Sequence, residues 1–409
     1  MNEQRASQVK VQQAFSETGA WSRRRLLGFV GKSGAAAGML GAGAWGHWGE
    51  LRLPELLGAS LPTEALKERK AARLAGALLL DSNENPFGMC DAARDALIVA
   101  AEEANRYPGE YQAELRNCIA EYHGVPVDHV ATGSGSTDIL RQAAGAWVRS
   151  DRSLVQAKPT FEALGFYSRA RGFDAISVPV DKAGRHDLEA MRAAIGNDTK
   201  LVYICNPGNP TGTLMRQSDL DSFIEDLPPH VVVLVDEAYH HYVDDPSYVS
   251  SLAHLENGRN VLVARTFSKV YGMAGLRAGY AIGPAPLIEE LRVQRLQNNI
   301  NAIAGACAVA SLNDEKYHHS QRTLNAEARK ILTDALDARE YDYWDSHTNF
   351  VMIMLGQEVG PTIRAFRERG VYVGRPFPDV PTNLRVSIGT AEQMKRFVEE
   401  FDEVMDVAS

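Results

Sequence analysis

The sequence predicts an α/β protein with a mainly parallel sheet flanked by helices, joined to a second, smaller α/β domain. Near-continuous apolar runs alternate with helical stretches, and three of these runs are Leu201–Cys205, Val231–Val235 and Val261–Ala264. Such runs are typical of strands buried on both faces of a parallel sheet. A polar motif follows each run. Because ligands of open α/β sheets bind beyond the carboxyl ends of the strands, we expect the functional site at that edge.

Two helices are predicted ahead of these strands. Helical periodicity covers Asp91–Asn105 and Tyr111–His123, and Gly124 is a natural stop for the second helix. We expect residues 107–305 to form the large domain.

A different pattern begins after about Gly305. A long helical region leads to a strand at His347–Leu355, a helix that ends near Gly370, and short strands around Val371 and at Leu384–Ile388. We expect residues 76–106 and 306–409 to form the small domain.

Composition favours small-molecule partners. A chain of 409 residues exceeds the size at which one hydrophobic core usually stops growing, which indicates at least two compact units. Its 45% hydrophobic and 23% charged residues are ordinary for a soluble globular protein. The net charge of −9 and the lack of a long Lys/Arg run argue against a nucleic-acid surface.

Neither the cysteines nor the paired histidines predict a metal site. The four cysteines are far apart, with no C-x-x-C pair: Cys90, Cys118, Cys205 and Cys307. His240–His241 and His318–His319 are adjacent pairs. Sequence neighbours rarely face one ligand site, so we expect these histidines on the surface or in loops.

The pattern near the N-terminus indicates an export signal. Ser22, three arginines and two leucines precede the Gly/Ala-rich stretch Gly28–Ala44, in which Lys32 is the only charge. This pattern resembles a twin-arginine signal. We expect a signal at residues 1–44 cleaved after Ala44, an arm at residues 45–75, and a periplasmic protein without stable membrane insertion. The alternative is an uncleaved amphipathic helix on a cytoplasmic protein.

A lysine-containing segment, Thr266–Tyr280, carries the most specific chemistry. Lys269 follows a predicted buried strand, sits beside two hydroxyls and precedes Arg277 by eight residues. Together these groups could hold a phosphate ester next to an imine-forming amine. A lysine taken alone would more often be a solvated charge.

This segment resembles that of the fold-type I aminotransferases, which use pyridoxal 5'-phosphate, and especially the branch containing histidinol-phosphate aminotransferase. The resemblance extends from about Asp81 to the C-terminus. It implies that Lys269 carries the cofactor as a Schiff base and moves the proton at the substrate α-carbon. It also implies that Thr266, Ser268 and Arg277 hold the cofactor phosphate.

Two further motifs match the family's contacts to the cofactor ring. Asp236 directly follows a predicted strand, and the resemblance implies that its carboxylate pairs with the ring nitrogen. Tyr239 and Asn209 would both donate to the ring oxygen. The plainer alternatives are an acidic strand end facing water and a proline-glycine turn at Asn206–Gly212.

The resemblance also places residues around the phosphate and on the ring face. Gly135, Ser136 and Thr137 lie in a glycine-rich turn before a predicted helix, whose N-terminus suits an anion. Phe161 would stack on the ring, although core packing explains it equally well. Tyr107 matches a tyrosine that reaches the phosphate of the neighbouring subunit, which implies a homodimer with shared sites.

Substrate contacts are implied at three positions. Arg385 matches the arginine that binds the substrate α-carboxylate through two parallel hydrogen bonds. Asn349 and Asn85 match positions that line the substrate side.

The order and spacing of these motifs favour an aminotransferase that passes an amino group from an amino acid to a keto acid or aldehyde. A decarboxylase or lyase on the same fold is one alternative, although Arg385 disfavours decarboxylation. A non-catalytic exported binding protein is another, and the intact Lys269 and Asp236 speak against it. Export would also suit a substrate other than histidinol phosphate, whose biosynthesis is cytoplasmic.

Overall fold

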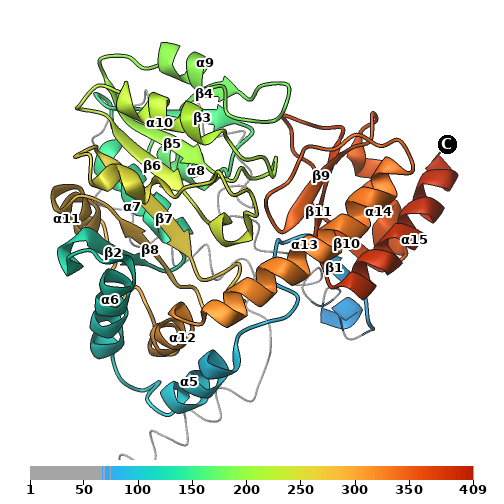
Figure 1. Cartoon of the computed structure of the whole chain (residues 1–409), viewed down its shortest axis with the longest axis horizontal. Helices are drawn as coiled ribbons and strands as arrows, with labels where there is room; N and C mark the ends of the chain where they lie inside the picture. Colours follow the sequence, from blue (N-terminus) through green and yellow to red (C-terminus); the bar gives the residue numbers. More distant parts are fainter. Residues whose placement is uncertain (1–66, 68–69, 74, 409) are drawn as a thin grey trace, which may run out of the picture. The chain divides into compact units, whose positions relative to one another are not determined.

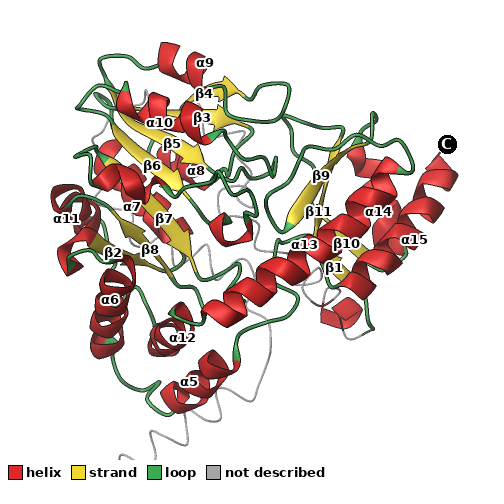
Figure 2. Cartoon of the chain, in the orientation of Figure 1, coloured by secondary structure: helices red, strands yellow, loops and turns green. Residues whose placement is uncertain are grey.

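The structure is a computed structural model that describes residues 67, 70–73 and 75–408 (Figure 1). The predicted signal at residues 1–44 lies outside the described residues, as does most of the predicted arm. The fold is α/β, as the sequence predicts, with helices on both faces of a mostly parallel sheet (Figure 2).

The main sheet has seven strands in the order β2-β8-β7-β6-β5-β3-β4. β8 runs antiparallel to both of its neighbours, and the other pairs are parallel. In sheet order the strands are Val130–Gly133, Gly279–Ile282, Val261–Thr266, Val232–Asp236, Thr199–Cys205, Ser153–Lys158 and Ile176–Pro179. The three strands predicted from apolar runs are β5, β6 and β7, and all three predictions are confirmed to within a few residues.

Successive side chains of a strand point to opposite faces of the sheet, so these apolar strands bury side chains on both faces, as is typical of a parallel sheet. In β5, Leu201 and Tyr203 join a core that contains residues of α7 (Ser136–Trp147), α8 (Ala163–Ala170) and α11 (Ala285–Val293). Val202 and Ile204 join the opposite core, with residues of α9 (Leu188–Ala193) and α10 (Gln217–Glu225). Both faces of the sheet are therefore covered by helices.

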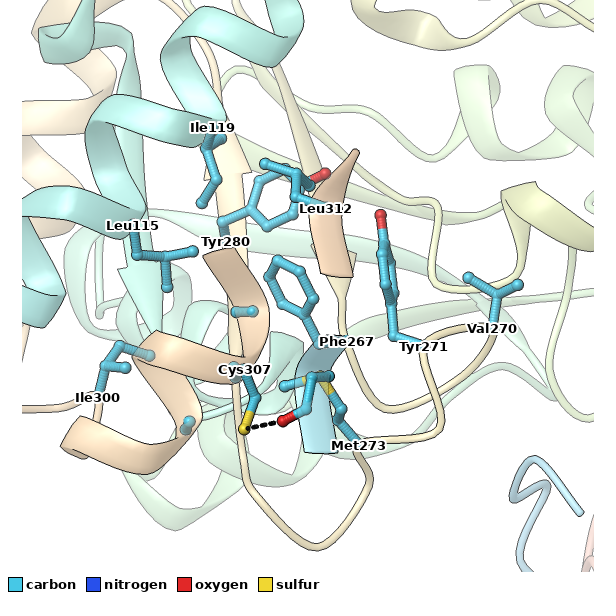
Figure 3. Packing of buried hydrophobic residues seen from close by; sticks show 14 of the residues in the cluster. Leu115, Ile119, Phe267, Val270, Tyr271, Met273, Tyr280, Ile300, Cys307 and Leu312 are labelled. Atoms are coloured by element: carbon cyan, nitrogen blue, oxygen red, sulfur yellow. Dashed lines mark hydrogen bonds between the residues drawn. The ribbon is translucent and has the colours of Figure 1, made fainter. Parts of the chain in front are cut away.

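A third core gathers at the β2–β8 side of the sheet (Figure 3). It contains residues of α5 (Asp91–Ala101), α6 (Gly109–His123) and α12 (Ala302–Leu312). Cys307 Sγ donates to the carbonyl of Ala93 over 3.2 Å, which joins α12 to α5. α6 ends as predicted, because Gly124 adopts the left-handed conformation at φ 64°. α5 ends at Ala101, earlier than the predicted Asn105, and the chain turns there.

The C-terminal part is a smaller α/β layer (Figure 1). β1 (Leu78–Leu80) pairs in parallel with β10 (Val371–Val373), and β9 (Phe350–Met354) pairs antiparallel with β11 (Asn383–Ser387). Three helices pack with these strands: α13 (Glu315–Asp337), α14 (Val359–Glu368) and α15 (Ala391–Ala408). The domain boundaries at residues 106 and 305 stay predictions, although α5 and α12 both join the core beside β2 and β8.

One histidine prediction is wrong. His318 is buried, and its ring lies 5.2 Å from that of His241 and 4.6 Å from that of Tyr271. Successive residues of α13 point about 100° apart around the helix, so His318 faces inward while its neighbour His319 is exposed.

The four cysteines are free thiols. Within the described residues, no group of His, Cys, Asp and Glu side chains could hold a metal ion. Over the same part of the chain, no helix combines the length and hydropathy that crossing a membrane requires.

Candidate active site

A cavity of about 260 Å³ lies where the carboxyl ends of the parallel strands meet, as the sequence predicts. Most of its lining comes from the ends of five strands of the main sheet and from the segments that follow them. From those segments, the predicted residues in the lining are Ser136, Thr137, Phe161, Asn209, Asp236, Tyr239, Thr266, Ser268, Lys269 and Arg277. Arg385 of β11 closes the opposite side. Residues up to 303 positions apart in the chain, from Ser82 to Arg385, therefore share one cavity.

One end of the cavity is suited to an anion. Arg277 Nη1 donates to Ser268 Oγ over 3.1 Å, and Thr266 Oγ1 donates to the same Oγ over 3.0 Å. α7 begins at Ser136, and the first turn of a helix leaves backbone N–H groups without helical partners. A guanidinium, two hydroxyls and a helix N-terminus thus converge.

Gly135 explains how the backbone comes so close to Arg277. Its φ is +80°, and a Cβ built there would lie 2.2 Å from Arg277 Nη2. Only glycine fits this conformation and this approach. Gly135 does not itself line the cavity, so its contribution is to let the α7 N-terminus and the Arg277 guanidinium lie close together. We call this end of the cavity, formed by Arg277, Thr266, Ser268 and the α7 N-terminus, the Arg277 anion seat.

Lys269 is the amine of the cavity. Nζ donates to the carbonyl of Asn83 over 3.0 Å and lies 5.2 Å from the centre of the Tyr239 ring. Burial, followed by the nearby Arg385 guanidinium, lowers the pKa of Lys269 to about 8. A much larger fraction of this amine is therefore uncharged near neutral pH than of an ordinary lysine.

Asp236 is the buried carboxylate among the cavity-lining residues, whereas Glu84 is exposed. Asp236 ends β6 and is only 1% exposed. Burial raises its pKa to about 6, against the lowering effect of hydrogen bonds from Tyr203 and the Ala238 N–H. The plainer alternative, an acidic strand end facing water, is excluded by this burial.

On the far side of the cavity, hydrogen bonds connect Arg385 to Asn209 and Asn209 to Tyr239. Arg385 Nη1 donates to Asn209 Oδ1 over 2.9 Å, and Asn209 Nδ2 donates to the Tyr239 hydroxyl over 3.3 Å. The second nitrogen, Arg385 Nη2, donates to the carbonyl of Asp81 over 3.0 Å. Two guanidinium nitrogens therefore point at acceptors that an incoming carboxylate could replace.

Phe161 lines the cavity, and it also packs against the core between the sheet and α7. Stacking of its ring on the cofactor stays a prediction.

Comparison with known proteins decides the family. A family model described as "Aminotransferase class I and II" matches residues 75–401, which is most of the chain. The chain belongs to the class I and II aminotransferases.

Individual relatives agree with this family. "Histidinol-phosphate aminotransferase 1" of Cupriavidus pinatubonensis is 39% identical over 329 residues, covering 79% of this chain and 87% of the relative. An aromatic amino acid aminotransferase of Thermobifida fusca is 37% identical over 319 residues, covering 78% of this chain and 88% of the relative.

A solved structure shares the fold. The histidinol-phosphate aminotransferase of Sinorhizobium meliloti, in complex with pyridoxal-5'-phosphate, aligns with a TM-score of 0.77 at 26% identity. The alignment covers 88% of this chain and 98% of that one.

The aminotransferase site contains one central residue that the sequence analysis missed. Asn83 is 2% exposed and adopts a left-handed φ of 52°. Its Nδ2 donates to the Tyr239 hydroxyl over 3.1 Å, and its Oδ1 accepts from Ser387 Oγ over 2.9 Å. Its carbonyl accepts from Lys269. The available signal was the motif Asn83-Glu84-Asn85-Pro86, in which Asn is the residue besides glycine that most readily takes positive φ.

Asn85 does not reach the cavity. Its Nδ2 donates to the carbonyl of Val270 over 2.8 Å and to Gln321 Oε1 over 3.1 Å, so its amide ties the segment to the lysine loop and α13. Asn83 lies in the cavity wall, and the substrate contact expected of Asn85 stays a prediction.

Asn349 and Tyr107 also lie outside the lining. Asn349 is 1% exposed, and its Nδ2 donates to the carbonyls of Asn83 and Glu84 over 3.0 and 3.3 Å. It holds the cavity wall from behind. Tyr107 is 89% exposed and contributes nothing to the cavity of its own chain.

Proposed function

We propose that this aminotransferase binds pyridoxal 5'-phosphate in the cavity and passes an amino group from an amino acid to a keto acid or aldehyde. The observation that carries the proposal is that Lys269, Asp236 and the Arg277 anion seat line one cavity. These groups fit the cofactor: an amine for its aldehyde, a buried carboxylate for its ring nitrogen, and cationic and N–H groups for its phosphate. Glycine at position 135 leaves room for that seat.

When bound, the cofactor supplies an aldehyde that condenses with amines and a ring that withdraws electrons from the bonds at the substrate α-carbon. The chain's own residues do the rest. Lys269 Nζ would hold the cofactor through its aldehyde, and when free this nitrogen would be a base of suitable pKa for the α-proton. Arg385 binds the α-carboxylate in place of Asn209 Oδ1 and the Asp81 carbonyl.

Two further groups act on the ring. The Asp236 carboxylate would pair with the ring nitrogen and keep it protonated, which would strengthen electron withdrawal. The Tyr239 hydroxyl and Asn209 Nδ2, which lie 3.3 Å apart, are placed to donate to one ring oxygen. Phe161 packs on the ring face.

Absorbance of the loaded protein tests the proposal. The wild type should show a band from the lysine-bound cofactor that shifts on addition of an amino acid, with release of the keto acid. Lys269→Ala should lack the covalent band. Lys330→Ala is the control, because that lysine is 72% exposed and pairs with Asp334 on α13. A wild-type protein without a band, or with one that no amine shifts, would contradict the function.

We also propose a homodimer with shared sites. The support is Tyr107, whose exposed ring matches a tyrosine that the family places at the neighbouring subunit's phosphate. Other apolar side chains are exposed on the described surface, including Ile98, Val99, Val293 and Leu296 at 63% to 72%. Tyr107→Ala and Lys269→Ala proteins, each inactive alone, should regain part of the activity after subunit exchange. No recovery in a mixed dimer would contradict shared sites.

For localisation, we propose export by the twin-arginine route. The support is the Ser22–Leu27 motif and the apolar stretch after it. Arg23→Lys combined with Arg24→Lys should retain the protein in the cytoplasm, whereas an unchanged distribution between compartments would contradict export.

A further inference from the structure

Behind Asp236, on the neighbouring strand, lies a tyrosine that no part of the proposed chemistry has used. Tyr203 is fully buried in β5, and its hydroxyl donates to Asp236 Oδ2 over 3.0 Å. In the sheet register Cys205 lies opposite Asp236, so Tyr203 is two residues earlier on the same face. The second carboxylate oxygen, Oδ1, accepts from the Ala238 N–H over 3.1 Å.

Each carboxylate oxygen of Asp236 thus has one donor from the protein, and the donors come from different segments. A carboxylate oxygen can accept more than one hydrogen bond, so a position remains on Asp236 for a cationic N–H in the cavity. The Ala238 N–H belongs to the same turn as Asp236. The Tyr203 hydroxyl is the donor that fixes the carboxylate from outside that turn.

We propose that Tyr203 is a positioning residue that holds the Asp236 carboxylate ionised and oriented toward the ring nitrogen of the cofactor. The inference rests on the proposed function, since it concerns the same site. Tyr203 does not line the cavity and acts through Asp236.

The charges around Asp236 explain why one hydroxyl matters. The titratable groups that face it are Tyr203 and Cys205 from β5, Glu237 and Tyr239 beside it, and Lys269 after β7. Burial raises the pKa values of Tyr203 and Cys205 well above their usual range, so both groups are neutral and Tyr203 remains a donor. Lys269 lowers the pKa of Asp236, and Glu237 raises it.

Without the Tyr203 hydroxyl, a main stabilising contact of the ionised form is lost. Burial already raises the pKa of Asp236 to about 6 with the hydroxyl present. Removing it moves the pKa of Asp236 further up, because the hydrogen bond from Tyr203 lowers it. Asp236 then has to release a proton before it can pair with a protonated ring nitrogen, and the cost is largest at low pH.

The test compares the affinity of full-length Tyr203→Phe and wild type for pyridoxal 5'-phosphate from pH 6 to pH 9. Hydrogen bonds to charged groups are strong enough that we expect about 10-fold weaker binding by the variant at pH 6.5. The ratio of the two dissociation constants should fall toward one at pH 9, where Asp236 is ionised in both proteins. Effects of pH on Lys269 and on the cofactor cancel in this ratio.

Tyr271→Phe is the matched control. Tyr271 is 1% exposed, and its hydroxyl faces His241 Nε2 over 3.4 Å instead of the carboxylate. The Tyr271→Phe variant should bind the cofactor with the affinity of the wild type at every pH. A second comparison does not depend on the stability of the single variant: adding Tyr203→Phe to Asp236→Asn should weaken binding no further, because the hydroxyl acts through the carboxylate.

Each outcome is distinct. A ratio of dissociation constants that falls toward one as the pH rises supports the inference. Wild-type affinity at all pH values, or a loss that is equal at all pH values, overturns it and leaves Tyr203 as a core residue. If the wild type itself fails to bind the cofactor, the proposed function fails instead.

Discussion

Asn83 holds several parts of the active site together. Its side chain bridges Tyr239 and Ser387, while its carbonyl accepts from Lys269 and Asn349. These contacts join the loop after β7, the turn after β6, the end of β11 and the residue just before β9. The left-handed backbone at φ 52° is what lets one residue present its side chain and its carbonyl to different neighbours.

A glycine at this position separates backbone from side-chain effects. Asn83→Gly keeps the positive φ but removes the hydrogen bonds to Tyr239 and Ser387, so we expect kcat/KM to fall about 10-fold. Asn83→Ala removes the same bonds and adds backbone strain, so its free energy of unfolding should drop by about 1 kcal/mol more. Steady-state kinetics and denaturant unfolding measure the two effects. Unchanged kinetics in Asn83→Gly would show that the side-chain bridge is dispensable.

At the residue scale, the sequence predicted the reactive and charged residues that lie in recognisable motifs. Lys269, Asp236 and Arg277 each followed a predicted strand, so the topology alone brings them together. Asn85 was a different case, because in an irregular segment no periodicity determines which of two nearby asparagines faces inward. Tyr203 was hidden for the opposite reason, since an apolar strand gives no sign that one of its residues contacts a carboxylate.

The lysine loop is held in place by contacts that only glycine allows. A Cβ at Gly272 would lie 1.9 Å from the carbonyl oxygen of Gly88, and its φ is +68°. The loop after β7 therefore lies directly against the segment that follows Asn85. Gly275, three residues further along, has no atoms within 4 Å of its would-be Cβ.

These two glycines give a matched pair of variants. Gly272→Ala should lower the free energy of unfolding by more than about 3 kcal/mol, because both the backbone conformation and the contact with Gly88 must change. Gly275→Ala should be nearly neutral. Thermal and denaturant unfolding measure both. Equal stability of the two variants would mean that the loop does not depend on this close approach.

At the element scale, strands were easier to predict than helix ends. β5, β6 and β7 are apolar on both faces and have polar residues at their ends, so their bounds are visible in the sequence. α5 extends no further than Ala101 although its periodicity continues, and the next four residues form an exposed turn. The four-residue sequence of β8 does not indicate that the strand runs antiparallel to its neighbours.

For the whole molecule, the fold class followed from the alternation of strands and helices, since few architectures can bury strands that are apolar on both faces. Buried histidines were harder to foresee. His186 and His318 each lie in the interior, and burial lowers the pKa values of both. Their burial depends on packing between distant elements, which single residues do not reveal.

These histidines predict that the protein loses stability in acid. His186 is 7% exposed and burial lowers its pKa to about 4, from 6.5 in the unfolded chain. Between pH 6.5 and 4 the unfolded state therefore binds a proton that folded His186 does not, which favours unfolding increasingly as the pH falls and levels off below pH 4. A shift of this size corresponds to about 3 kcal/mol at pH 4.

His186→Gln removes this proton, so the loss of unfolding free energy between pH 7 and pH 4 should be about 3 kcal/mol smaller than in wild type. Comparing the change with pH, instead of the stability at one pH, removes the constant cost of altering a buried side chain. His319→Gln is the control, because His319 is exposed on α13 and should leave the slope unchanged. Denaturant unfolding at several pH values measures the slope. If His186→Gln and wild type lose stability in parallel, His186 takes up its proton in the folded state, and the acid sensitivity must come from other groups.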